Sequence, residues 1–188
     1  MDDMLQMRKR ALFMRWLNEP AKWEAKGTVV HARADPRTDF WRKTHDGGTR
    51  DNGHFYYQPV TGNFTAQVKL RGEYRDPYDQ AGLMARVDET TWLKCGVELV
   101  DGRPLASVVV TRDFSDWSVV PISETSVVWW RLTRDGGTFE VCYALDGTQF
   151  QRFRQSFLSE SPQVDVGLMI CSPVGEGFAA TFEDLQVG

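Results

Sequence analysis

The stretch DQAGLMARVDETTWLKCGVELVDGRPLASVVVT, from Asp79 to Thr111, contains three short runs in which apolar and polar residues alternate. Successive side chains of a β-strand point to opposite faces, so this period of two predicts strands with two different faces. One face would be apolar and carry Leu83, Ala85, Val87, Leu93, Cys95, Val97 and Leu99. The other would carry Gln80, Met84, Arg86, Lys94 and Glu98. The stretch therefore predicts a sheet that buries one face and presents polar groups on the other.

Turn-forming sequences separate short runs rich in Val, Phe, Tyr, Trp and Thr along most of the chain. Asp101-Gly102, Asp135-Gly136-Gly137 and Asp146-Gly147 each join two alternating runs, and Asp-Gly favours the tight turns of β-hairpins. Regular short strands between such turns are typical of an antiparallel sandwich or barrel. The chain has 188 residues, which fits one domain of typical size. We therefore expect an all-β protein with one main core.

The N-terminal segment has two interpretations. The apolar residues of Met4–Leu17 have spacings compatible with a short helix, which an Asn-Glu-Pro sequence would end. Alternatively, translation begins at Met14 and the residues before it are an extension. Arg15 interrupts the apolar stretch, which is also too short for a secretory signal. We expect residues 1–15 to be an extension or a short helix, and residues 16–188 to be one domain.

Composition narrows the classes of partner. A formal net charge of −4 gives no electrostatic basis for binding nucleic acid. No apolar run approaches the roughly 20 residues of a membrane span. Cys95, Cys142 and Cys171 each lie in an apolar run without Cys-x-x-Cys spacing, so we expect buried free thiols in a reducing compartment. These features predict a cytoplasmic protein without nucleic-acid or membrane partners and leave its oligomeric state open.

Five sequence blocks occur in an order that resembles a known family. They are WLNEPAKWE (16–24), TDFWRKTHDGGTRDNGHFYY (38–57), YDQAGLMARVDETTWLKCGVE (78–98), SVVVTRDFSDWS (107–118) and VGLMICSP (166–173). Together they resemble the DUF1349 family, also called the regulation-of-enolase family, of the concanavalin A-like lectin/glucanase superfamily. The resemblance implies a jelly-roll-like sandwich of two antiparallel sheets with ligands on or beside a concave sheet. It also implies a metabolic enzyme such as enolase as a partner.

One departure from the superfamily concerns catalysis. Its glucanases often carry an E-x-D-x-x-E or E-x-D-x-E strand, whose alternate carboxylates point into the cleft. The nearest candidate here is Glu98, and Asp101 follows at odd spacing within a turn. The sequence therefore argues against retaining glycosidase chemistry of that type.

The first candidate site joins polar residues of the Asp79–Thr111 stretch. Adjacent strands lie about 4.8 Å apart, so side chains that share a face can form one patch. A carboxylate beside a lysine, here Glu98 and Lys94, can orient sugar hydroxyls or transfer a proton. The same residues are also consistent with a cross-strand salt bridge on a solvated face. The patch comprises Gln80, Arg86, Lys94, Glu98, Ser107 and Thr111.

A second candidate site surrounds the glycine-rich turn THDGGTR (44–50). Loops at the end of a sandwich commonly supply ligand contacts. Trp41 offers a flat face to a sugar ring, and Asp39 and Asn52 can accept from and donate to its hydroxyls, with His54 close in sequence. In the alternative interpretation the aspartates cap turns and the tryptophan packs in the core.

Asp116, in the block FSDWS (114–118), is the third candidate. If it faces the same groove as Glu98, the two residues form the pair of carboxyl groups that glycoside hydrolysis requires. Asp116 is equally consistent with a residue that caps a turn.

The sequence predicts no metal and no cofactor. His31, His45 and His54 lack the spacing of a transition-metal site, and the acidic residues near the glycine-rich turn form only a weak calcium pattern. The glycine-rich loops that bind nucleotides and the G-x-S-x-G motif are also absent from the sequence.

Three functional hypotheses follow. The first is a non-catalytic or weakly catalytic module that binds a carbohydrate or a sugar-derived metabolite. The second is a regulatory protein that binds a metabolic enzyme such as enolase. The third is an atypical glycoside hydrolase that uses Glu98 and Asp116. The candidate ligand-binding residues are Asp39, Trp41, Asn52, His54, Gln80, Arg86, Lys94, Glu98 and Asp116.

Overall fold

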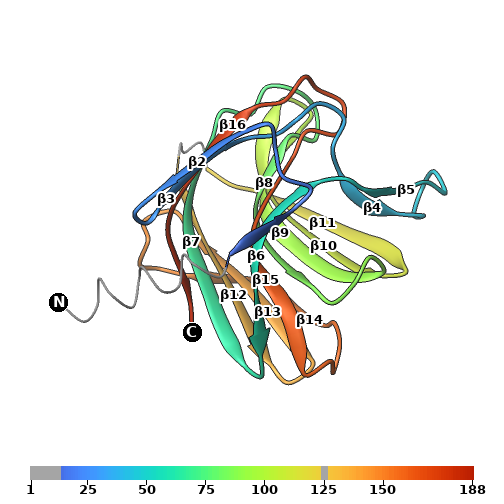
Figure 1. Cartoon of the computed structure of the whole chain (residues 1–188), viewed down its shortest axis with the longest axis vertical. Coiled ribbons are helices and arrows are strands. Elements are labelled where there is room, and N and C mark those ends of the chain that lie inside the picture. Colours follow the sequence, from blue (N-terminus) through green and yellow to red (C-terminus); the bar gives the residue numbers. More distant parts are fainter. Residues whose placement is uncertain (1–13, 124–126) are drawn as a thin grey trace.

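The computed structural model describes residues 14–123 and 127–188, whose regular structure consists of β-strands. Two seven-stranded antiparallel sheets form a sandwich, and a two-stranded hairpin lies beside the first sheet (Figure 1). The first sheet has the order β1 (Arg15–Leu17), β6 (His54–Thr61), β15 (Gln163–Cys171), β8 (Gln80–Arg86), β9 (Thr91–Val100), β10 (Arg103–Arg112) and β11 (Phe114–Pro121). The second has the order β14 (Gln151–Phe157), β13 (Thr138–Ala144), β12 (Val128–Asp135), β7 (Phe64–Gly72), β16 (Ala179–Val187), β3 (Val29–Arg33) and β2 (Lys22–Lys26). The hairpin consists of β4 (Phe40–Arg42) and β5 (Thr49–Asp51).

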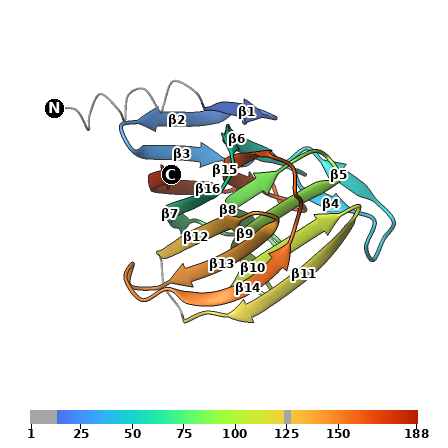
Figure 2. The same cartoon turned by 90° about the horizontal axis from the view of Figure 1, so that it is seen from below.

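This architecture confirms the predicted all-β sandwich. Figure 2 shows the two layers from a second direction, with β11 and β14 at corresponding edges of the two sheets. The predicted hairpins form around all three Asp-Gly turns, between β9 and β10, β12 and β13, and β13 and β14. At the first of them Asp101 and Gly102 both have positive φ, 51° and 73°, as a tight turn between twisted strands requires. Within the described ranges, no helix is long and apolar enough to span a membrane.

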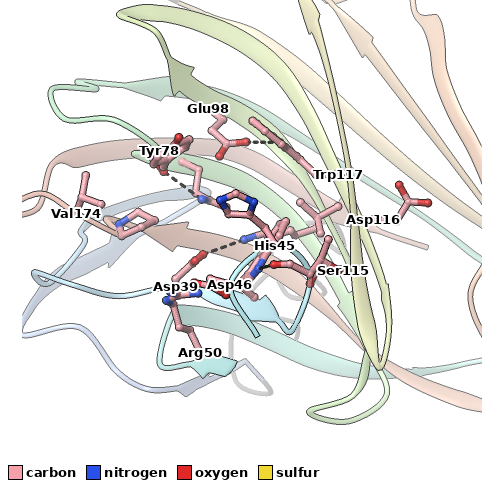
Figure 3. Close-up of a pocket in the computed structure, with 16 residues that line it drawn as sticks. Asp39, His45, Asp46, Arg50, Tyr78, Glu98, Ser115, Asp116, Trp117 and Val174 are labelled. Atoms are coloured by element: carbon pink, nitrogen blue, oxygen red, sulfur yellow. Dashed lines mark hydrogen bonds and ion pairs between the residues drawn. The ribbon is translucent and has the colours of Figure 1, made fainter. Parts of the chain in front are cut away.

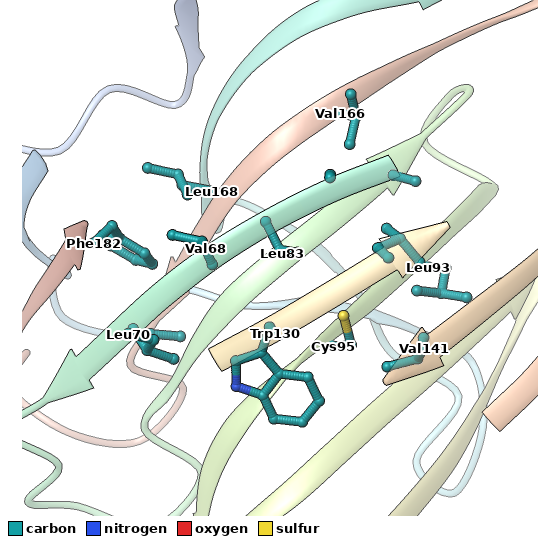
Figure 4. Packing of buried hydrophobic residues seen from close by; sticks show 14 of the residues in the cluster. Val68, Leu70, Leu83, Leu93, Cys95, Trp130, Val141, Val166, Leu168 and Phe182 are labelled. Carbon is teal, nitrogen blue, oxygen red and sulfur yellow. The ribbon is translucent and has the colours of Figure 1, made fainter. Parts of the chain in front are cut away.

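The main core lies between the two sheets. We call the face of the first sheet that packs against the second its inner face, and the opposite face its outer face. Leu83 and Leu93 of the inner face are buried in one apolar cluster with Val68 and Trp130 of the second sheet (Figure 4). Burial of each large apolar side chain is worth about 1.5–3 kcal/mol, so this cluster is the main source of stability. The predicted apolar face is therefore confirmed.

A second, smaller apolar cluster covers part of the outer face. Phe40 of the hairpin packs there with Met84, Trp92 and Val109 of the sheet, and the ring centroids of Phe40 and Trp92 are 6.2 Å apart. The hairpin is thus fixed against the outer face of the sheet, whereas the sequence analysis grouped it with loops at the end of the sandwich. The three cysteines are free and buried, as predicted.

The prediction for the N-terminal segment can be compared with the structure only from residue 14 onward. Most of residues 1–15, where an extension or a short helix was expected, lies outside the described residues. The part that is described is not helical, because Arg15–Leu17 forms β1 and pairs with β6. Trp16, assigned to the helix in one interpretation, instead packs against Tyr56 at a ring-centroid distance of 4.8 Å.

Candidate functional site

A pocket of about 880 Å³ hollows the outer face of the first sheet beside the hairpin (Figure 3). Its floor is formed by Gln80, Lys94, Glu98 and Val109 of β8, β9 and β10. The hairpin and its turn form one wall with Asp39, Trp41, Thr44, His45, Asp46 and Arg50. The other walls come from Ser115, Asp116 and Trp117 of β11 and from Tyr78, Pro173 and Val174 in loops.

Strand register explains why these side chains meet. Gln80 lies opposite Glu98 across β8 and β9, and Val109 lies opposite both Lys94 and Trp117. Between Lys94 and Glu98 on the same face is a glycine, Gly96, whose lack of a side chain lets the backbones of β8 and β9 approach closely. The Lys-x-Gly-x-Glu pattern of β9 therefore places two ionisable groups on the pocket floor, on either side of a close contact between β8 and β9.

Lys94 is buried, with 3% of its surface exposed. Its Nζ donates to Asp39 Oδ1 at 3.1 Å and to the backbone oxygen of Phe40 at 2.6 Å. A buried ammonium group requires such compensation because its transfer from water is costly. The interpretation of Lys94 and Glu98 as a salt bridge on a solvated face is wrong: both are buried, and the ion pair of Lys94 is with the hairpin.

Glu98, with 5% of its surface exposed, is held by neutral donors. Ser107 Oγ donates to its Oε2 at 2.5 Å, and Trp117 Nε1 donates to the same oxygen at 3.0 Å. Burial raises the pKa of the Glu98 carboxyl above its ordinary value, while Lys94 and the two hydrogen bonds act in the opposite direction. Glu98 thus combines a constrained position with a carboxyl group that gains a proton more readily than usual.

The rim of the pocket is aromatic. Tyr78 and Trp117 are 43% and 39% exposed, and their rings meet edge to face with centroids 6.4 Å apart. Trp41, on the opposite wall, is fixed by a hydrogen bond of 2.8 Å from its Nε1 to the backbone oxygen of Thr44. Trp41 packs against the small apolar cluster and also lines the pocket, so its packing role is confirmed in part and its contact with a sugar ring stays a prediction.

Three predicted site residues do not line the pocket, namely Arg86, Asn52 and His54. Arg86 forms a bidentate ion pair with Asp51 at 2.7 and 2.8 Å, which ties β8 to the hairpin. Asn52 Oδ1 accepts a hydrogen bond from the backbone nitrogen of Asp39, and its Nδ2 donates to the backbone oxygen of Arg37. These two residues hold the hairpin in place, and the assignment of either as a ligand contact is wrong for this pocket.

His54 is likewise structural. Its Nδ1 is 2.6 Å from the backbone oxygen of Asn18 and therefore carries the proton, since a carbonyl can only accept. Its Nε2 accepts from the backbone nitrogen of Asp35 at 2.9 Å. Both ring nitrogens of this buried imidazole are therefore bonded to backbone groups of the segments that follow β1 and β3, and it does not reach the pocket.

Asp116 reaches the pocket only at its edge. It lies opposite Val110, whose side chain belongs to the main core, so Asp116 and Glu98 point to opposite faces of the first sheet. Figure 3 shows the Asp116 carboxylate directed away from the other labelled side chains, and its Oδ2 accepts from Arg154 Nη2 at 3.0 Å. The hypothesis of a glycoside hydrolase that pairs Glu98 with Asp116 is therefore wrong.

Sequence reasoning missed several residues that line the pocket, among them Tyr78, Trp117, His45 and Arg50. Trp117 was missed because its neighbour Asp116 was considered for the groove, and neighbours in a strand point to opposite faces. A usable signal was the alternation of Ser107, Val109 and Thr111 on one face of β10. Because the turn to β11 is tight, Trp117 pairs with Val109 and shares that face. Among residues 14–123 and 127–188, no three side chains of His, Cys, Asp or Glu are grouped so that they could hold a metal ion.

Comparisons with solved structures extend these observations. A crystal structure of a functionally unknown protein from Saccharomyces cerevisiae has a TM-score of 0.90 and 36% identity, over 93% of this chain and 95% of that one. The GH43 protein BlXynB from Bacillus licheniformis has a TM-score of 0.70 and 15% identity, over 94% of this chain and 36% of that one. The carbohydrate-binding module CBM66 from Bacillus subtilis has a TM-score of 0.59 and 12% identity, over 92% and 94%. The last two share the fold alone, which is the concanavalin A-like sandwich.

Sequence comparisons assign the family. The chain is 37% identical over 170 residues to "Regulation of enolase protein 1" of Saccharomyces cerevisiae, covering 90% of this chain and 86% of that protein. The model of DUF1349, described as a protein of unknown function, matches residues 16–188. The resemblance seen in the five sequence blocks is thereby confirmed. The chain belongs to the DUF1349 family.

Proposed function

We propose that the pocket binds a carbohydrate or a sugar-derived metabolite and that the protein acts through binding. One observation carries the proposal: buried polar side chains, Gln80, Lys94 and Glu98, form the floor of an open pocket whose rim is aromatic. Sugars present apolar ring faces together with hydroxyl groups in fixed directions. Aromatic rings suit the former and constrained polar groups suit the latter.

Several polar atoms of the pocket are free to bind hydroxyls. Gln80 donates from its Nε2 to the backbone oxygen of Tyr78, and no donor from the described residues reaches its Oε1. The same holds for Oε1 of Glu98, whose two hydrogen bonds both end on Oε2. The hydroxyls of Thr44 and Tyr78 and the imidazole of His45 form no side-chain hydrogen bond within the described ranges. The pocket thus offers a set of oriented donors and acceptors.

Nuclear magnetic resonance of the tryptophan side chains tests the proposal directly. The Nε1–H of Trp117 is bonded to Glu98 on the pocket floor, whereas Trp129 lies beside Lys69 on the second sheet. Titration with a panel of mono- and oligosaccharides should shift the Trp117 signal and leave the Trp129 signal in place. Glu98→Gln should weaken the response at least tenfold, and Trp129→Phe should not. Absence of any shift at Trp117 across a broad panel would rule the proposal out.

A second candidate function is regulation of a metabolic enzyme such as enolase, suggested by the name of the yeast relative. One structural observation favours it, which is the exposure of Tyr78, Trp117 and Val174 together at the pocket rim. Exposed apolar groups that cluster can form the centre of a protein interface. Mixing the purified chain with enolase should then give a complex on gel filtration, which Trp117→Ala should weaken. Elution of two separate proteins at high concentration would contradict this role.

A further inference from the structure

Four acidic residues belong to the pocket lining, although the carboxylate of Asp116 is directed to the other face of the sheet, and they are not equally compensated. Three of them have a cationic partner within the chain: the pairs are Asp39–Lys94, Asp46–Arg50 and Asp116–Arg154. Glu98 forms no ion pair with any residue of the described ranges and is bonded only to the neutral groups of Ser107 and Trp117. It is also the most buried of the four, with 5% of its surface exposed against 8% for Asp39. The pocket therefore contains one carboxylate whose charge the chain itself does not balance.

The nearby lysine does not change this conclusion. Lys94 attracts the Glu98 charge and so favours its ionised form, but Asp39, which is bonded to that lysine, repels it. When all three groups are ionised, Lys94, Asp39 and Glu98 together carry one net negative charge. Desolvation of this charge is unfavourable unless a proton or another cation neutralises it.

The surroundings of Glu98 are suited to an organic cation. The indole nitrogen of Trp117 donates to Glu98 Oε2, which fixes that ring beside the carboxylate. Tyr78 completes an edge-to-face pair with Trp117, and both rings are partly exposed at the pocket rim (Figure 3). Faces of Trp and Tyr rings attract ammonium groups, by about 0.5–2 kcal/mol each depending on desolvation. Glu98 Oε1, which receives no hydrogen bond from the described residues, remains available as the acceptor.

We propose that the ligand of this pocket carries a protonated amine, as an amino sugar does, and that the ammonium group binds Glu98 Oε1 beside Trp117 and Tyr78. This inference rests on the proposed carbohydrate-binding function and specifies the class of sugar. The hydroxyls of the ligand then meet Gln80, Thr44 and His45, while the ammonium balances the charge that the chain leaves unbalanced. A neutral sugar fills the same space but leaves the Glu98 carboxylate without a counter-charge.

Calorimetric titration with four small molecules separates the contributions. The probes are glucosamine, which has both sugar and ammonium, glucose and N-acetylglucosamine, which are uncharged, and cyclohexylamine, which has the ammonium without hydroxyls. At a pH where the amines are protonated, glucosamine should bind at least about tenfold more tightly than either neutral sugar, a difference of about 1.4 kcal/mol. Glu98→Gln should remove this preference. Glu183→Gln, which makes the same change at a carboxylate of the second sheet that is paired with Lys69, is the matched control and should keep it.

The outcomes distinguish the two proposals. If glucose and N-acetylglucosamine bind as tightly as glucosamine, the ammonium inference is overturned and the carbohydrate function stands. If cyclohexylamine binds as tightly as glucosamine and Glu98→Gln abolishes both, the ammonium inference is supported and the sugar is not what the pocket recognises. If neither amine binds to a wild-type protein whose thermal unfolding shows that it is folded, the inference is wrong. A preference for glucosamine that survives in Glu98→Gln would also contradict it, because the charge would then be balanced elsewhere.

Discussion

The two faces of β9 are equally buried but are built on different principles. Leu93 faces inward and packs among apolar side chains of both sheets, while its neighbour Lys94 faces outward and is bonded to Asp39 and to the backbone of Phe40. Both residues are almost inaccessible to solvent. Burial alone therefore does not distinguish the structural face from the functional one. The difference lies in what each side chain contacts. Leu93 packs against many apolar side chains, whereas Lys94 is bonded to two particular oxygen atoms.

This difference teaches how the pocket is kept in shape. Apolar contacts on the inner face are many and interchangeable, so the loss of one is felt as lost packing. On the outer face the hairpin is held by a few directed bonds, from Lys94 to the hairpin, from the Arg42 backbone to Ser115 Oγ at 2.9 Å, and between Arg86 and Asp51. The loss of one of these leaves a buried polar group unpaired, which is a different kind of penalty.

The largest effect is expected from Lys94→Met. The variant keeps most of the side-chain volume but leaves the buried Asp39 without its cation, and removal of one partner of a buried ion pair costs about 3–5 kcal/mol. Chemical denaturation should therefore show a loss of stability in that range. The double variant Lys94→Met with Asp39→Asn should recover most of it, because no uncompensated charge is left.

Leu93→Ala provides the contrast on the other face. It should cost about 2–5 kcal/mol through the lost contacts and the cavity, and no second substitution by a polar residue should restore it. If the Lys94 double variant remained as unstable as the single one, the outer face would be stabilised like the inner face, by packing alone.

Gly96→Ala should have the next largest effect. A Cβ atom at Gly96 would lie 2.0 Å from the backbone oxygen of Ala81, so β8 and β9 would have to separate at the pocket floor. We expect a loss of about 1–3 kcal/mol, typical of overpacking, together with weaker ligand binding. Gly48→Ala in the hairpin is the control, since its nearest neighbour would be the carboxylate of Asp46 at 3.2 Å. Equal stability of the two variants would show that the glycine is not needed for close strand approach.

Much of the fold could be predicted because it depends on local patterns. The alternation around Leu93 and Lys94 correctly assigned side chains to the two faces, and the Asp-Gly turns correctly located three hairpins. These signals arise within a few residues of each other along the chain. Period and turn chemistry are physical properties of the local backbone, so no knowledge of distant partners is needed.

The pocket was harder to predict because its bonds join distant segments. Asp39 and Lys94 are 55 residues apart in sequence, and nothing in either local pattern indicates that the hairpin folds over the sheet. The orientation of β11 also depends on its turn, where Asp113 has a φ of 64° and aligns Arg112 with Phe114. That register directs Trp117 to the pocket and Asp116 away from it. A shift by one residue would exchange the two, and the hypothesis that Asp116 faces the groove corresponds to that shifted register.

A smaller effect, visible through pH, is expected from Glu98→Gln. Because burial raises the pKa of Glu98 in the folded state above its ordinary value of 4.5, the folded protein binds more protons than the unfolded chain between these two values. The unfolding free energy should therefore fall as the pH rises through this window. Lys94 and Asp39, the charged groups that act on Glu98, remain in both proteins, so the difference between wild type and variant isolates this carboxyl.

The measurement is the unfolding free energy of both proteins as a function of pH. Relative to the Gln variant, the wild type should become less stable as the pH rises from about 4.5 towards neutrality. A difference that grows in the opposite direction would show that Glu98 is stabilised as a carboxylate in the folded pocket. In that case its hydrogen bonds to Ser107 and Trp117 outweigh the cost of burial.

The smallest effect is expected from Asp116→Asn, which removes a carboxylate by the same isosteric change as Glu98→Gln. The side chain of Asp116 is 68% exposed and its partner is Arg154, and exposed ion pairs contribute less than about 1 kcal/mol. Stability should change by less than that amount, and the affinity for any ligand of the pocket should be unaltered, because the carboxylate faces away from the floor. Calorimetry on both variants checks this. If Asp116→Asn weakened binding as much as Glu98→Gln, both carboxylates would have to act on one ligand, and the paired-carboxylate hydrolase that the register of β11 excludes would return as a hypothesis.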